Sequence, residues 1–236
     1  MIIRPHTEGH LLITQPDHAA LAGRIMAHWA GLDSPRRADI LTAVAAHDNG
    51  WLDVDAVPLR EAGTGGVLDF MHVPLDLRQG VWPRSVGLLR EAPYAAALVA
   101  QHAIHIFSRF RGHDEWTPFF AQMEQLRDEA LARSGAAPLE TLIREYMFVR
   151  LGDLISLTFC NAWPDVPGED YGYTIRRDGT RVILTPDPFA GREVPVGIIG
   201  RLLPNEHPTD AAAARAAWET APRVTVSGVV SGAPAC

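Results

Sequence analysis

AHDNGW, residues 46–51, is the stretch that decides the fold expected for this chain. It ends a predicted helix in which Ile40, Val44 and His47 share one face at i, i+4 and i+7 spacing. The adjacent His47 and Asp48 offer a neutral nitrogen and an anionic oxygen to one point, which suits a divalent metal ion. The stretch predicts a metal site built on helices. The alternative is a helix C-terminal cap, because the helix dipole favours a cationic histidine there.

Two residues on other predicted helices extend this pair to four ligands. His18 lies on the apolar face of a helix predicted from Pro16 onward, as a metal ligand or as a core-edge histidine. Asp153 lies within the apolar run 151–159, and a buried carboxylate there needs a partner. The candidate partners are the metal ion and Arg150, which is one helical turn away.

Other histidines could bind a second ion. His102 and His105 share one face of an apolar helix, either as hydrogen-bonded core residues or as groups that face a second metal or the substrate. His72 is a further candidate ligand within residues 52–83, a stretch rich in Gly, Pro and Asp that we expect to be an irregular loop over the site. The sequence is therefore compatible with one or two divalent ions.

Two other motifs are weaker. His113-Asp114 is a second His-Asp pair, but it lies in a polar loop and is expected on the surface. The two cysteines, Cys160 and Cys236, do not form a disulfide framework.

Composition excludes several classes of protein. The 236-residue chain has a net charge of −7 and no run of basic residues, which argues against a nucleic-acid surface. Its apolar runs are far shorter than the roughly 20 residues of a membrane span, and its start does not match a secretory signal. We expect a cytoplasmic protein without nucleic-acid or membrane partners.

The order His18, His47-Asp48, Asp153 resembles that of the HD-domain superfamily of metalloproteins. A narrower resemblance, to an uncharacterised bacterial family of HD-like proteins, covers most of the chain. It rests on four segments: TQPDH at 14–18, AHDNGW at 46–51, DLISL at 153–157 and PDPF at 186–189. The resemblance implies that the four residues are ligands of the first metal. In dinuclear members additional histidines bind the second metal, and His72 and His102 fall at similar intervals here.

The expected fold is mainly α, an HD-like helical bundle with a small β-sheet appendage formed by the N-terminal hairpin and the C-terminal strands. Residues 1–14 would form the hairpin, which packs on the C-terminal sheet, residues 15–163 the HD-like domain, and residues 164–236 the β-rich appendage. Alternating apolar residues around Asp178-Gly179 predict a hairpin in the last segment.

The chain departs from the resemblance at one position. Many HD proteins follow the His-Asp pair with a glycine and a phosphate-binding lysine, whereas Trp51 stands at the place of the lysine here. Phosphate binding would therefore depend on the metal or on arginines such as Arg78 and Arg84. Trp51 and Trp82 are the predicted apolar walls of the substrate pocket, Arg84 an anion contact, and His105 a substrate-facing group.

The leading functional hypothesis is a metal-dependent hydrolase of HD type that acts on a small phosphorylated molecule, with Asp48 as the catalytic residue and Zn²⁺, Mn²⁺ or Fe²⁺ as the cofactor. One alternative is an HD-type diiron oxygenase that uses His72 and His102. Another is a non-catalytic module that binds a metal or ligand. The predicted partner is a small-molecule substrate, and a homodimer is the candidate assembly.

Overall fold

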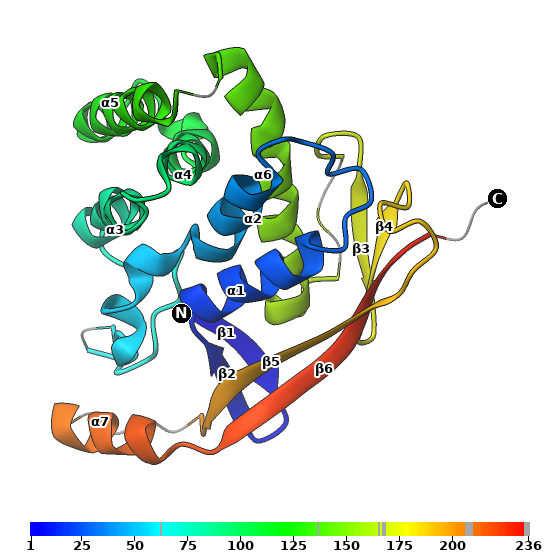
Figure 1. Cartoon of the computed structure of the whole chain (residues 1–236). Helices are drawn as coiled ribbons and strands as arrows, with labels where there is room; N and C mark the ends of the chain where they lie inside the picture. The colour runs from blue at the N-terminus through cyan, green and yellow to red at the C-terminus, as the bar shows by residue number, and fades with distance from the viewer. Residues whose placement is uncertain (62, 136, 165, 167–168, 206–209, 234–236) are drawn as a thin grey trace.

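The computed structural model describes residues 1–61, 63–135, 137–164, 166, 169–205 and 210–233, so Cys236 lies outside the described residues. Within this part of the chain a curled six-stranded sheet lies beside a group of helices (Figure 1). About 50% of the chain is helical and about 20% is strand. The expectation of a mainly α bundle with a small β appendage is therefore wrong.

The sheet joins strands from both ends of the chain. Its order is β1-β2-β5-β6-β4-β3, and every pairing is antiparallel except that of β4 with β6. The hairpin predicted for the N-terminus is confirmed, and its second strand pairs with β5, where Leu11 lies opposite Leu202. The strands are β1 (Ile2–His6), β2 (Gly9–Ile13), β3 (Thr174–Asp178), β4 (Arg181–Thr185), β5 (Val194–Leu203) and β6 (Arg223–Gly232).

The helices pack on one side of this sheet, except for the last, which lies at the far end of the two long strands (Figure 1). The described α-helices are α1 (Gln15–Met26), α2 (Arg37–Ala46), α3 (Leu75–Leu88), α4 (Pro93–Ile106), α5 (Thr117–Ser134), α6 (Leu139–Asn161) and α7 (Ala211–Thr220). No helix in the described residues combines the length and apolar character that crossing a bilayer requires.

Helices and sheet share one hydrophobic core, which is why the sheet is a layer of the fold. Ile25 of α1 and Ile155 of α6 are fully buried in the same cluster as Ile2 of β1, Leu184 of β4 and Ile198 of β5. Removing such apolar area from water is the main stabilising contribution to a fold of this size. The sheet buries one face against α1 and α6 and so fixes where these helices lie.

One helix begins earlier in the chain than the sequence predicts. The stretch 52–83 is irregular only up to Pro74, since α3 begins at Leu75 and contains Trp82. Glycines and the internal Pro83 weaken the helical pattern of α3, and its packing against other elements overrides that weak propensity.

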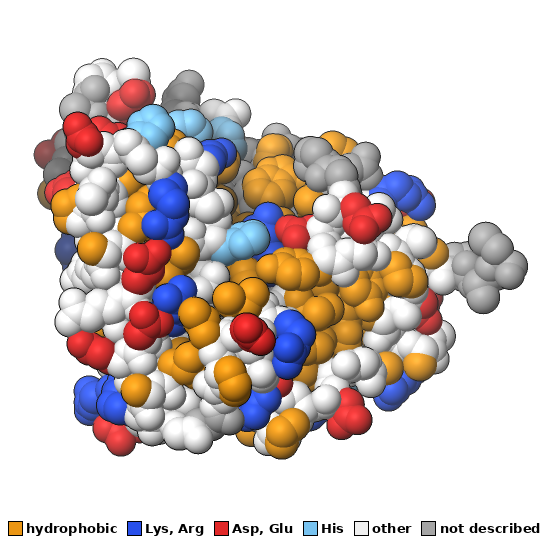
Figure 2. Space-filling model, turned by 90° about the horizontal axis from the view of Figure 1, so that it is seen from above, with side chains coloured by type: hydrophobic (Ala, Val, Ile, Leu, Met, Phe, Trp, Pro, Cys, Tyr) orange, Lys and Arg blue, Asp and Glu red, His pale blue; other side chains and the backbone are white. Residues whose placement is uncertain are grey.

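The surface mixes charges of both signs. On the face seen from above, hydrophobic side chains gather in one patch, and basic and acidic side chains are interspersed around it (Figure 2).

Candidate metal centre

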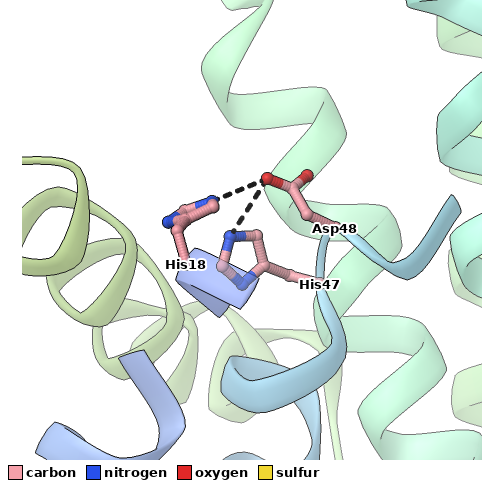
Figure 3. Close-up of side chains that lie close together, drawn as sticks. All are labelled: His18, His47 and Asp48. Atoms are coloured by element: carbon pink, nitrogen blue, oxygen red, sulfur yellow. Dashed lines mark hydrogen bonds and ion pairs between the residues drawn. The ribbon is translucent and has the colours of Figure 1, made fainter. Parts of the chain in front are cut away.

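Five buried polar side chains from four helical segments meet in the interior. They are His18 of α1, His47 and Asp48 at the end of α2, His102 of α4 and Asp153 of α6; each is at most 5% exposed. Figure 3 shows His18, His47 and Asp48 pointing toward one another. The structure thus brings together the four residues predicted as the first metal's ligands and one further predicted ligand, His102.

Close packing of the helices makes this convergence possible. Gly152, next to Asp153, faces α1 and α2, and a Cβ there would lie 2.8 Å from the Val44 side chain and 2.9 Å from that of Met26. These distances are shorter than real contacts of a Cβ atom. Glycine at 152 therefore lets α6 approach close enough to place Asp153 beside the histidines.

The hydrogen bonds of His18 fix which ring nitrogen faces the cluster. Its Nδ1 lies 2.8 Å from the Ser156 hydroxyl, and that hydroxyl donates to the carbonyl oxygen of Asp153 at 3.0 Å. The hydroxyl must then accept from Nδ1–H, so the neutral ring presents an unprotonated Nε2. This Nε2 is 2.8 Å from Oδ2 of Asp48. Two acceptors at this distance require a proton or a metal ion between them.

The other two histidines have the same orientation. Nδ1 of His47 donates to the carbonyl oxygen of Val44 at 2.8 Å, and Nδ1 of His102 lies 2.9 Å from the Tyr146 hydroxyl. Their Nε2 atoms face the two carboxylates, and Nε2 of His47 has no hydrogen-bond partner in the described residues. Metal-ligating histidines ordinarily bond the other ring nitrogen to an oxygen in this way.

The spacing of the ligand atoms fits a metal ion. Nε2 of His47 lies 3.6 Å from Oδ2 of Asp48 and 3.6 Å from Oδ1 of Asp153, and Nε2 of His18 lies 4.0 Å from that Oδ1. Ligand atoms bound at about 2.1 Å to one ion lie roughly 3.0–4.2 Å from each other. Two overlapping groups, His18/His47/Asp48 and His47/His102/Asp153, each bring their ligand atoms within 4.8 Å of one another. These buried residues could therefore hold a metal ion.

The charges of the cluster call for a cation. Burial lowers the pKa of His47, but the carboxylates of Asp48 and Asp153 outweigh it and raise this pKa to about 9. Burial raises the pKa of Asp153, but the nearby rings of His47, His102 and His18 outweigh it and hold this pKa well below its usual range. Burial lowers the pKa of His102 to about 3, so its ring is neutral. The cluster therefore stabilises positive charge between two carboxylates, which is where a divalent ion would bind.

A pocket of about 190 Å³ opens onto the cluster, and Asp48, His102 and Asp153 line it. Trp51 and Trp82, the predicted apolar walls, also line it. Larger hollows of about 560 Å³ and 730 Å³ elsewhere on the molecule contain none of the five cluster residues. We therefore take the smaller pocket as the candidate substrate site.

Three predicted site residues lie outside the cluster and do not line this pocket. The His72 side chain is 69% exposed, and its Nδ1 pairs with Asp69. Arg84 donates to the carbonyl oxygen of Gly50. His105 is half-buried against the Tyr146 ring. The six-ligand set of a dinuclear centre is thus not assembled among the described residues.

Three residues at the site, Ser156, Tyr146 and Arg109, were not predicted from the sequence. Ser156 and Tyr146 are three and seven residues from Asp153 on α6, so helical periodicity places them on its face. Arg109 lies in a short 3-10 helix, and no local pattern links it to the pocket that it lines. Arg150, the alternative partner of Asp153, has Nη1 3.6 Å from Oδ2 of Asp153 and also pairs with Asp170. The predicted surface position of His113-Asp114 is confirmed.

The chain belongs to a protein family of unknown function, DUF3891, whose profile matches residues 1–205. All five cluster residues lie within the matched range. No curated protein and no solved structure matches the chain.

Proposed function

We propose that this member of the family is a metal-dependent hydrolase that binds one divalent ion and acts on a small phosphorylated molecule. Its ligands would be His18, His47, Asp48 and Asp153, in the order found in HD-domain hydrolases, with His102 beside them. Three imidazole nitrogens and two carboxylates form a mixed set that suits Zn²⁺, Mn²⁺ or Fe²⁺. Nε2 of His47 and Oδ1 of Asp48 support this proposal, because both are buried and have no hydrogen-bond partner among the described residues.

The observation that carries the hydrolase proposal is the charge of the pocket beside the cluster. Apart from Asp48 and Asp153, its charged lining residues are all arginines: Arg78, Arg109 and Arg150. The chain as a whole has a net charge of −7, so this local excess of positive charge is not a reflection of composition. Guanidinium groups match the geometry of phosphate oxygens and stay protonated. They supply the cations that the absent HD-type lysine would otherwise provide.

The proposed reaction is hydrolysis of a phosphate monoester. A divalent ion at this site would polarise a phosphoryl oxygen and lower the pKa of a bound water. The arginines orient the phosphoryl group, and the free Oδ1 of Asp48 accepts a proton from the attacking water. A bond forms between the water oxygen and phosphorus, the ester P–O bond breaks, and the proton passes to the leaving oxygen. The products are an alcohol and inorganic phosphate.

Metal content and phosphate release test the proposal together. Protein purified without an affinity tag or chelator should contain about one Zn, Mn or Fe per chain and release inorganic phosphate from phenyl phosphate. The Asp48→Asn variant should lose activity by at least about 100-fold, because it removes the proton acceptor and a ligand. The chain offers a matched control in its second His-Asp pair, since Asp114 is exposed and does not line the pocket. Asp114→Asn should retain wild-type metal content and activity.

Three outcomes would overturn the proposal. Protein that takes up no metal on titration would remove the metal site. About two irons per chain, with oxygen-dependent chemistry, would favour a diiron oxygenase. A metal-loaded chain that hydrolyses no phosphate ester would leave a non-catalytic binding module.

A further inference from the structure

The pocket beside the cluster is small for an enzyme site. Its volume of about 190 Å³ is only slightly larger than a cavity of about 150 Å³ that holds benzene. Pockets for drug-sized ligands measure about 300–1,000 Å³. The volume therefore suits a phosphoryl group with a small organic part, and it does not suit a nucleoside phosphate with its base, sugar and phosphate.

Aromatic rings form much of the pocket wall. Trp51, Phe70, Trp82 and Phe107 come from four separate parts of the chain and line the same space. Trp82 packs edge-on against Phe107, with ring centroids 6.0 Å apart, so the two rings brace each other. Rings braced in this way form rigid apolar surfaces, which favour a flat ligand part that stacks or packs edge-on.

Polar atoms without partners occur among these wall residues. Nε1 of Trp51, Nε1 of Trp82 and Oε1 of Gln15 are buried, and none has a hydrogen-bond partner in the described part of the chain. All three residues line the pocket. Buried polar groups in folded proteins are nearly always paired. The pocket is the space that these residues border in common, so its occupant is the candidate partner.

We infer that the substrate is a compact phosphate monoester whose organic part is one flat ring or an unsaturated chain of similar size, with polar atoms at its edge. The edge accepts from an indole N–H and donates to Gln15. A nucleotide is larger than the pocket and is expected to bind more weakly. This inference rests on the proposed hydrolase function and narrows its substrate class.

Ligand titrations test the size limit. The zinc-loaded protein is titrated by calorimetry with phenylphosphonate and, separately, with adenosine monophosphate. Phenylphosphonate should bind at least about tenfold more tightly and should be displaced by inorganic phosphate. Equal or tighter binding of the nucleotide would overturn the inference. Nucleotide hydrolysis by the same protein would overturn it too, while leaving the hydrolase proposal intact.

A pair of ligands tests whether an indole N–H of the pocket donates to the substrate. Pyridylphosphonate has a ring nitrogen where phenylphosphonate has carbon, and among its ring isomers the best should bind about 3- to 10-fold more tightly because it accepts from an indole N–H. Trp82→Phe or Trp51→Phe keeps a ring and removes the N–H, so one of them should abolish this preference. Trp163→Phe, outside the pocket lining, is the control and should retain it. If no pyridyl isomer is preferred, or if both pocket variants keep the preference, the assigned role of the indoles is wrong.

If zinc binds but neither phosphonate nor inorganic phosphate does, the hydrolase proposal itself fails. Size selectivity and anion binding are therefore judged by different outcomes.

Discussion

Replacing Ser156 by alanine tests whether the hydrogen bonds around the cluster prepare it for a metal ion. The Ser156 hydroxyl is fully buried, lies 2.8 Å from Nδ1 of His18 and donates to the carbonyl oxygen of Asp153 at 3.0 Å. This pair of bonds forces the proton of His18 onto Nδ1 and leaves Nε2 free for a metal. Without the hydroxyl, His18 can move its proton to Nε2 and donate to Asp48, which competes with metal binding.

The expected loss follows from comparable partners of metal-bound histidines, whose removal lowers metal affinity by about 10- to 100-fold. This corresponds to roughly 1.4–2.7 kcal/mol of binding free energy. The variant should also lose about 1–3 kcal/mol of unfolding free energy, because a buried Nδ1–H loses its acceptor. Metal affinity and stability therefore both fall, and a control must separate them.

Thr158→Val is the matched control. Its hydroxyl is also fully buried on α6, but it bonds to the carbonyl oxygen of Leu154, outside the cluster. This variant should lose about 0.5–1.5 kcal/mol of stability and keep the wild-type zinc affinity. Zinc affinity is measured at pH 7.5 by competition with a chromophoric chelator. Equal zinc affinities for Ser156→Ala and Thr158→Val would refute the argument that Ser156 sets the tautomer of His18.

The remaining predictions concern pH and packing. In the metal-free protein, the pKa of His47 is raised to about 9, so the protonated ring stabilises the fold fully below pH 6.5. This contribution is lost as the pH rises through 9. The pKa of His102 is lowered to about 3, so its neutral ring contributes to stability above pH 6.5. That contribution is lost as the pH falls from 6.5 toward 3. Thermal unfolding with chelator present should thus show maximum stability near pH 6.5, and a flat profile would contradict these shifts. Gly152→Ala should cost about 1–3 kcal/mol in urea unfolding and weaken zinc binding, because α6 must move away from α1 and α2. Gly50→Ala should destabilise similarly, since its Cβ would overlap the carbonyl oxygen of Val81; wild-type stability of either variant would contradict the close packing.

Much of the secondary structure was predictable from local patterns. The hairpin around Asp178-Gly179 and the helix predicted from Pro16 onward both occur as expected, because turn residues and helix starts depend on near neighbours. Prediction failed for α3, where Pro83 weakens the local helical signal and packing against other elements decides the conformation. The joining of the N-terminal hairpin to the C-terminal strands was predicted, but the role of the sheet was not, because burial of its face against α1 and α6 depends on tertiary packing.

The sequence by itself determined the chemistry of the candidate site. His18, His47, Asp48 and Asp153 were identifiable because ligand type and helical periodicity are local properties of a chain. Only the tertiary structure decided that His102 joins these residues, whereas His72 is exposed and pairs with Asp69. It also decided that Arg109 lines the pocket beside them. The physical reason is that convergence depends on how closely distant helices pack, as at Gly152, and no local pattern records that distance.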